Sequence, residues 1–176
     1  MTAAIAREVV MTTRSPEETR AAGRAVAELL EPGDVVVLDG QLGAGKTVFA
    51  KGVADGLGVT ETVVSPTFTL AREYQGRLRL VHVDVYRLDH VQEFLDLGLE
   101  DLAGDDAVTL VEWGEAVAAE LPAEHLEVRL DPDGTAAGAG RDGPEPEDER
   151  ELTLRFRGPA WLRRIDAVRT ALTGTA

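Results

Sequence analysis

Residues 40–47 read GQLGAGKT and fit the pattern G-x-x-x-x-G-K-[ST] of a phosphate-binding loop. The glycines allow positive φ angles, so that successive backbone N–H groups can point inward at phosphate oxygens. The lysine can reach the β and γ phosphates, and the threonine hydroxyl can bind Mg²⁺. The alternative is a glycine turn that happens to precede a lysine. The residues predicted to bind nucleotide are Gly40, Gln41, Leu42, Gly43, Ala44, Gly45, Lys46 and Thr47.

The segments on either side of this loop have the expected patterns. Residues 35–38 read VVVL and predict a strand, whereas residues 46–56 are apolar-periodic and predict a helix that ends in Gly56-Leu57-Gly58. Such a helix aims the positive end of its dipole, about half a charge, at bound phosphates. The order of strand, loop and helix therefore favours the phosphate loop over a chance glycine turn.

Two acids near the ends of apolar strands are candidates to complete the site. Asp84 lies in LVHVDVYR, and Glu112 lies in VTLVEW. A Mg·ATP site commonly needs one acid near the metal and one that orients water or a metal-bound water. Asp84 and Glu112 are therefore predicted to act together, although either could instead cap a helix or pair with an arginine.

Residues 65–69 read SPTFT and have the character of a switch loop, in which hydroxyls such as that of Thr67 sense a γ-phosphate. The alternative for this segment is the proline-containing entry to a hairpin. His82 is more typical of a histidine satisfied within a strand than of a catalytic base. The sequence lacks the Asn-Lys-x-Asp segment that reads guanine, which favours ATP over GTP.

The rest of the chain predicts alternating strands and helices. Strands are expected at 7–13 and 107–111, and hairpins at 67–74 with 78–86 and at 125–130 with 151–157. Helices are expected at 16–30, behind a capping box formed by Ser15 and Glu18, and at 90–97, 116–121 and 159–172. The chain is therefore of the α/β class, with antiparallel hairpins in its sheet.

Length and composition favour one domain that spans residues 1–176. The chain has no cysteine and no apolar run that approaches the length of a membrane span, so we expect a soluble, cytoplasmic protein that does not engage a membrane. A net charge of −14 disfavours direct binding to nucleic acid. The six arginines of residues 150–176 are a basic patch or a solvated face. Residues 131–149 are rich in Gly, Pro and acids, and we expect a disordered insertion there.

The motifs together resemble one known family. GQLGAGKTVFAKGVADGLG, VVSPTFTLAREY, LVHVDVYRLD, LGLED and LVEWGE follow the motif order of the TsaE family, also called YjeE. These small bacterial ATPases are required for the threonylcarbamoyladenosine modification of tRNA. The similarity covers about residues 15–165. It implies the fold of a P-loop NTPase, an α/β three-layer sandwich with a mixed, partly antiparallel central sheet.

The resemblance implies that the chain binds and slowly hydrolyses ATP with Mg²⁺, together with the TsaB and TsaD proteins, and that it meets tRNA only indirectly through that complex. Lys46 and Thr47 match the phosphate and metal ligands, Asp84 matches the Walker-B-like acid, and Glu112 and Trp113 match the Glu-Trp motif. The implied roles are then catalytic for Asp84, Glu112 and Thr67, metal-binding for Thr47 and Glu112, and nucleotide-binding for Trp113.

This sequence departs from the family pattern at three places. Gln41 replaces the usual Asp and removes a charge beside the loop, and Gly114 replaces the usual Pro after Trp113. The acidic insertion at 131–149 has no counterpart. We expect altered nucleotide affinity from the first change and a looser turn from the second.

Two other classes of function stay open. A small-molecule kinase would need an acceptor pocket and usually an arginine-bearing lid, but no Arg-rich lid follows the loop's helix. A nucleotide-dependent binding module would not hydrolyse ATP usefully. Arg72 and Arg87 are the arginines near the switch and Walker-B segments, and Arg87 could instead pair with Asp84 or Asp89. The site therefore looks incomplete, and we expect a weak ATPase that a partner stimulates.

Overall fold

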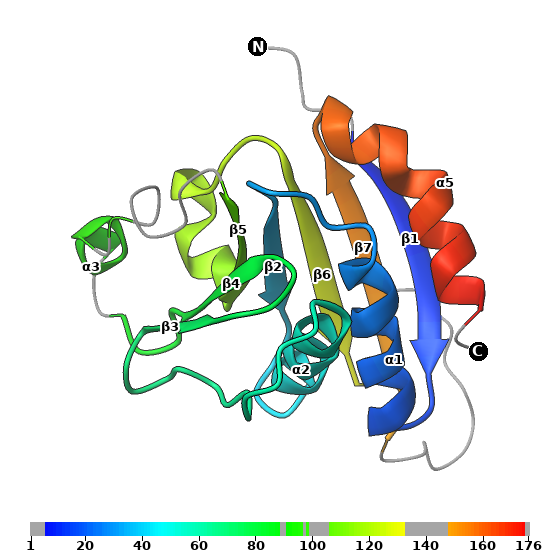
Figure 1. Cartoon of the computed structure of the whole chain (residues 1–176), viewed down its shortest axis with the longest axis horizontal. Helices are drawn as coiled ribbons and strands as arrows, with labels where there is room; N and C mark the ends of the chain where they lie inside the picture. Colours follow the sequence, from blue (N-terminus) through cyan, green and yellow to red (C-terminus); the bar gives the residue numbers. More distant parts are fainter. Residues whose placement is uncertain (1–5, 89–90, 97, 99–105, 133–147, 175–176) are drawn as a thin grey trace.

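The computed structural model describes residues 6–88, 91–96, 98, 106–132 and 148–174. A seven-stranded sheet forms its centre, with the strand order β1-β7-β6-β2-β5-β4-β3 (Figure 1). The strands are β1 (Ala6–Thr13), β2 (Val35–Asp39), β3 (Ala71–Tyr74), β4 (Arg79–Asp84), β5 (Ala107–Glu112), β6 (His125–Asp131) and β7 (Arg150–Arg157). The α-helices are α1 (Pro16–Ala27), α2 (Lys46–Gly56), α3 (Val91–Asp96) and α5 (Pro159–Thr173), and η2 (Gly114–Glu120) is a 3₁₀ helix. No helix among these residues has the length and apolarity needed to cross a bilayer.

The middle of the sheet is parallel, and its outer parts are antiparallel. β2 pairs in parallel with both β5 and β6, and β5 pairs in parallel with β4. The hairpins β3–β4 and β6–β7 are antiparallel, as is the pairing of β1 with β7. Because β2, β4 and β5 run in one direction, their carboxyl ends meet at the same edge of the sheet. The predicted mixed, partly antiparallel sheet is confirmed.

Helices cover the two faces of the sheet unequally. Figure 1 shows α1 and α2 in front of the central strands and α5 beside β1, and these helices share the larger core with Val36 and Leu110 of the sheet. A smaller core joins the opposite face of β4 and β5 to Phe94 of α3 and Val117 of η2. The predicted three-layer arrangement is therefore confirmed around β2, β5 and β4.

The β1–β7–β6 half of the sheet carries charged residues on the face away from the helices. Glu8, Arg155 and Glu127 lie side by side across the three strands, and Arg155 Nε is 2.6 Å from Glu8 Oε1. Arg157 also pairs with Glu127, and Arg164 of α5 pairs with Asp34. Exposed pairs such as Arg155 with Glu8 contribute about 0–1 kcal/mol each to stability, whereas Arg164 and Asp34 are mostly buried. Acids therefore partner several of the C-terminal arginines, which favours the solvated face over a basic patch.

Several predicted boundaries differ from the structure for local reasons. α1 ends at Ala27, not at about residue 30, because Leu29 N and Leu30 N donate to the carbonyls three residues back, those of Val26 and Ala27. β3 begins only at Ala71, since Leu70 has a φ of 63°. The helix predicted at 116–121 is η2, which starts earlier and kinks at Val117.

Other predictions stand with smaller changes or were not tested. The N-terminus of α1 has half of the predicted capping box: Glu18 N donates to Ser15 Oγ, but the Glu18 carboxylate accepts from Arg14 N. The helix predicted at 90–97 is α3, and both of those end residues lie outside the described part of the chain. Residues 133–147, most of the predicted disordered insertion, lie outside it as well.

Glycines let α1 pack closely against α2, the helix that carries the phosphate loop. A Cβ on Gly52 would lie within van der Waals overlap of the Arg20 carbonyl, and a Cβ on Gly23 would overlap the Phe49 carbonyl. At the rim of this contact Arg20 forms an ion pair with Asp55. Because Gly23 and Gly52 have no side chains, the backbones of α1 and α2 can approach each other closely.

We predict that Gly52→Ala lowers the free energy of unfolding by about 1–3 kcal/mol, because a backbone carbonyl cannot move aside as a flexible side chain can. This net loss remains after the roughly 1 kcal/mol that alanine gains over glycine in helix propensity, because the cost of the steric overlap is larger. Denaturant unfolding of the variant measures the change. Gly174→Ala is the control, since the nearest atom to its new Cβ is an ordinary 3.5 Å away. An unchanged Gly52→Ala midpoint would contradict the packing described here.

Candidate functional site

The loop between β2 and α2 has the backbone conformation of an anion-binding turn. Gly40, Gly43 and Gly45 all have positive φ angles, of 141°, 80° and 104°. A Cβ on Gly40 would also collide with the Leu130 carbonyl of β6. Gly45 caps α2 without a side-chain hydrogen bond, and the first turn of α2 holds no acid. The N-terminal N–H groups of α2 therefore form a site suited to phosphate.

Lys46 lies across the mouth of the loop. Its Nζ donates to the carbonyls of Gly40 and Gln41 at 2.7 and 2.9 Å, and it sits 3.6 Å from the centroid of the Trp113 ring. Burial lowers the pKa of Lys46, whereas the nearby carboxylates, Glu112 first, act in the opposite direction. The ammonium is therefore held at the loop by carbonyl dipoles and by the face of an aromatic ring.

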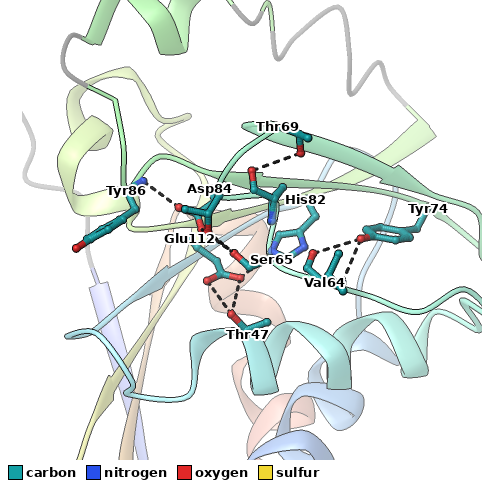
Figure 2. A network of polar contacts seen from close by, with 11 residues as sticks. Thr47, Val64, Ser65, Thr69, Tyr74, His82, Asp84, Tyr86 and Glu112 are labelled. Carbon is teal, nitrogen blue, oxygen red and sulfur yellow. Dashed lines mark hydrogen bonds and ion pairs between the residues drawn. The ribbon is translucent and has the colours of Figure 1, made fainter.

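Glu112 ends β5 directly beside the loop. The strand register sets it opposite Leu38 of β2, and its carboxylate is almost fully buried. Thr47 Oγ1 donates to it, with distances of 3.3 and 3.2 Å to its two oxygens, and His82 Nε2 lies 2.8 Å from Oε1 (Figure 2). The predicted pair of Thr47 and Glu112 thus meets in space, although 65 residues separate the two along the chain.

Asp84 ends β4 next to Glu112 and holds the 65–69 segment. Asp84 and Glu112 face each other in the parallel register of β4 and β5. The hydroxyls of Ser65 and Thr67 donate to Asp84 Oδ2 at 2.8 and 2.7 Å, and Tyr86 N donates to Oδ1 at 2.9 Å. The acid that matches the Walker-B-like position is therefore bound to the switch-like loop, a contact that Figure 2 shows for Ser65.

The base of the 65–69 segment is tied down and its tip is exposed. The backbone of Val64 exchanges hydrogen bonds of 3.3 Å with the Tyr74 hydroxyl. Phe68, at the tip, is 84% exposed, and the Arg87 guanidinium lies 4.4 Å from the centroid of its ring. Arg87 thus contacts the loop, while the described partners of Asp84 are hydroxyls and a backbone N–H.

Trp113 closes the site from the β5 side in a conformation that is rare for a bulky residue. Its φ is 65°, its N–H donates to Leu38 O, and its ring packs on Tyr86 at 4.7 Å between centroids. The following Gly114 is tightly enclosed, because a Cβ there would overlap Val37 of β2. Val37 thus occupies the space that a side chain at position 114 would need, and the looser turn expected at Gly114 stays a prediction.

A profile of the family described as "Threonylcarbamoyl adenosine biosynthesis protein TsaE" matches residues 13–140. The chain belongs to the TsaE family. The TsaE protein of Treponema pallidum is 49% identical over 118 residues, which cover 67% of this chain and 87% of that protein. The TsaE protein of Bacillus subtilis is 44% identical over 143 residues, which cover 81% and 82%. The crystal structure of Bacillus subtilis YdiB superposes with a TM-score of 0.76 at 36% identity, over 96% of this chain and 98% of that one.

Both the fold class and the TsaE resemblance drawn from the sequence are confirmed. The structure gathers the predicted site residues into two contacts, Thr47 with Glu112 and Thr67 with Asp84. Leu42, in contrast, points outward at the tip of the loop and is 76% exposed. The chemical roles of these residues stay predictions.

Two residues at the site were missed. Asp39 is a buried acid at the end of β2, and it accepts a hydrogen bond from Glu115 N at 2.9 Å. The rule that found Asp84 and Glu112, an acid at the end of an apolar strand, would have found it. Arg150 begins β7 and donates to Ala44 O of the loop at 3.1 Å. No local signal identifies that contact, because the two residues are 106 positions apart.

We predict that Asp39→Asn raises the melting temperature at neutral pH. Burial raises the pKa of Asp39, so its charged form destabilises the folded chain, while an amide oxygen can still accept from Glu115 N. The cost of the charge is complete above the raised pKa, shrinks as the pH falls towards the ordinary value of 3.8, and disappears below that value, where both states hold the proton. The gain should therefore fade between neutral and acid pH.

Thermal melts at several pH values measure this effect. Asp166→Asn is the matched control, because its side chain is exposed on α5. A gain that stays constant with pH, or one that equals the control, would show that the buried charge is not the cause.

Proposed function

We propose that this TsaE-family protein binds ATP with Mg²⁺ in the loop of residues 40–47 and hydrolyses it slowly, as the ATPase component of tRNA threonylcarbamoyladenosine biosynthesis. The observation that carries the proposal is the contact of Thr47 with Glu112 at the first turn of α2. It unites a loop suited to phosphate with a hydroxyl and a carboxylate, the oxygen ligands that Mg²⁺ prefers.

The residues present fit such a metal. No cluster of three or more His, Asp or Glu that could hold a metal by itself occurs among the described residues. Mg²⁺ typically takes only one or two carboxylates from the protein and completes its shell with water and phosphate oxygens. Thr47 and Glu112 would hold the ion, and the ion would supply charge neutralisation on the phosphates.

The other side chains then have distinct tasks. The N–H groups of the loop and Lys46 would bind the phosphates, since a released Lys46 Nζ can exchange its two carbonyl acceptors for phosphate oxygens. Trp113 would border the nucleotide beside Lys46. Asp84 and Thr67 would orient water or report the γ-phosphate through the 65–69 segment.

The arrangement supports a weak ATPase that needs partners, for which TsaB and TsaD are proposed. Arg87 lies over Phe68, and Arg150 donates to a loop carbonyl, so each has a neighbour other than phosphate. Phe68 and Leu42 each have an exposed apolar side chain that a partner could contact. The chain would act in the cytoplasm. Its net charge of −14 disfavours direct binding to tRNA, which it would therefore meet only through that complex.

Lys46→Ala should weaken nucleotide binding by on the order of 2 to 4 kcal/mol, because a charge and its hydrogen bonds to phosphate are lost. Equilibrium titration with a fluorescent ATP analogue measures the change. Lys51→Ala is the matched control, since Lys51 is the chain's other lysine and lies on the same helix. Equal affinities of Lys46→Ala and the unmodified chain would remove the phosphate-loop assignment.

Phosphate release by the isolated protein should be slow and should rise when TsaB and TsaD of the same organism are added. A partner that supplies an arginine to the transition state typically contributes ~10³ to 10⁵ in rate. A partner could also act by ordering the 65–69 segment. Labelled ATP follows the phosphoryl group. Transfer to an acceptor would indicate a kinase, and no release in any mixture would indicate a binding module. Equal rates per molecule with and without the partners would refute the stimulated ATPase.

A further inference from the structure

His82 is a fully buried polar residue in the middle of β4 with one polar contact. Its side chain is 0% exposed, and its Nε2 lies 2.8 Å from Glu112 Oε1. Its other ring nitrogen, Nδ1, has no hydrogen-bond partner within the described part of the chain. The neighbours of His82 in the sheet are Arg72 of β3 and Leu110 of β5. Its contact with Glu112 is thus its polar link to the site.

The contact of Nε2 with Glu112, and the lack of a described partner for Nδ1, fix where the imidazole proton lies. A proton on Nδ1 would leave a buried N–H without an acceptor and would place the Nε2 lone pair against a carboxylate oxygen, and both arrangements are unfavourable. A proton on Nε2 instead donates to Glu112 Oε1. His82 is therefore the donor in this hydrogen bond, and Glu112 is the acceptor.

The hydrogen bond restricts the carboxylate that faces the loop. His82 reaches Glu112 from β4, whereas Thr47 reaches it from α2, so the two donors approach from different elements (Figure 2). The His82 ring is held within the sheet and cannot follow a carboxylate that turns. With Oε1 fixed in this way, the other lone pairs of Glu112 stay directed to the place where Thr47 lies.

We infer that His82 is a positioning residue, which acts through Glu112 to set the affinity of the site for Mg²⁺ with nucleotide. The inference rests on the proposed function, in which Glu112 holds the metal. Groups that hydrogen-bond to a metal-ligating side chain typically change metal affinity by 10–100-fold when they are removed. If His82 merely filled the core, an apolar side chain would stabilise the fold more, because it has no buried nitrogen that lacks a hydrogen-bond partner.

The test compares three variants at this position. His82→Leu keeps bulk and removes the donor. His82→Gln carries an amide N–H near the position of Nε2, and His82→Asn carries one near Nδ1, too short to reach Glu112. A fluorescent ATP analogue is titrated into each protein in EDTA and then at increasing Mg²⁺, with thermal melts in parallel. Glu112→Gln serves as the reference for loss of the metal ligand.

All three His82 variants should bind the analogue in EDTA as the unmodified chain does. The Mg²⁺ concentration that gives half-maximal enhancement of binding should rise about tenfold or more in His82→Leu and His82→Asn. In His82→Gln it should stay close to the value of the unmodified chain. The double variant His82→Leu/Glu112→Gln should shift no further than Glu112→Gln alone, since both changes act through one carboxylate. If His82→Leu does not fold, the difference in Mg²⁺ dependence between His82→Gln and His82→Asn still tests the inference.

Two outcomes overturn the inference, and they can be told apart. If Glu112→Gln shifts the Mg²⁺ dependence but His82→Leu and His82→Asn do not, or if the two shifts simply add, His82 does not act through Glu112. If Mg²⁺ has no effect on binding by the unmodified chain, the proposed function fails, and the role of His82 fails with it.

Discussion

The parallel pairing of β2 with β5 is the constraint on which the candidate site depends. It sets Leu38 opposite Glu112, so that the chain leaving β2 turns through the glycine loop and returns in α2 with Thr47 against the Glu112 carboxylate. β4 extends the same parallel arrangement by one strand and adds Asp84 at the same level. A shift of one residue in either pairing would turn these acids to the opposite face of the sheet. Packing disfavours such a shift, because Val36 and Val37 lie on opposite faces of β2 and are both buried against different neighbours.

The site buries charges of both signs, and each has polar partners. Phosphate oxygens could replace the carbonyls that accept from Lys46, and a metal ion or its bound water could replace the hydroxyls that donate to the acids. Asp84 and Glu112 are compensated by hydroxyls, an imidazole and a backbone N–H, and Lys46 by two carbonyls and an aromatic ring. A buried carboxylate without such donors would cost several kcal/mol. The contacts therefore preserve the geometry of the acids without closing the site to phosphate, since hydroxyls and the lysine can change partners at small cost. His82 differs from them, because its ring is fixed in the sheet.

The fold could be inferred from the sequence wherever the signal was local. The phosphate loop, the bounds of α2 and the separate strands of the two hairpins depend on glycine, on hydrophobic period and on β-branched residues, and each of these signals is visible within about ten positions. The start and kink of η2 and the start of β3 could not be inferred, because local propensity does not indicate positive φ values at Trp113 and Leu70. In the site, the types of residue were readable from the sequence and their pairings were not. Nothing local indicates that Thr67 meets Asp84, or that His82 meets Glu112.

The 65–69 segment connects the surface of the protein to its buried acids by a short path. Phe68 is exposed, and the adjacent Thr67 donates to Asp84, which is anchored in β4 next to Glu112. A protein that bound the Phe68 side chain would therefore act on the Thr67 hydroxyl one residue away, while the Tyr74 hydroxyl holds the base of the segment at Val64. Such a contact could release or tighten the hold on Asp84 without deforming the sheet, because the movable part is a loop and the fixed part is a strand. Under the proposed function, partner binding and control of hydrolysis would thus be two effects of one segment, and no longer path through the core is required.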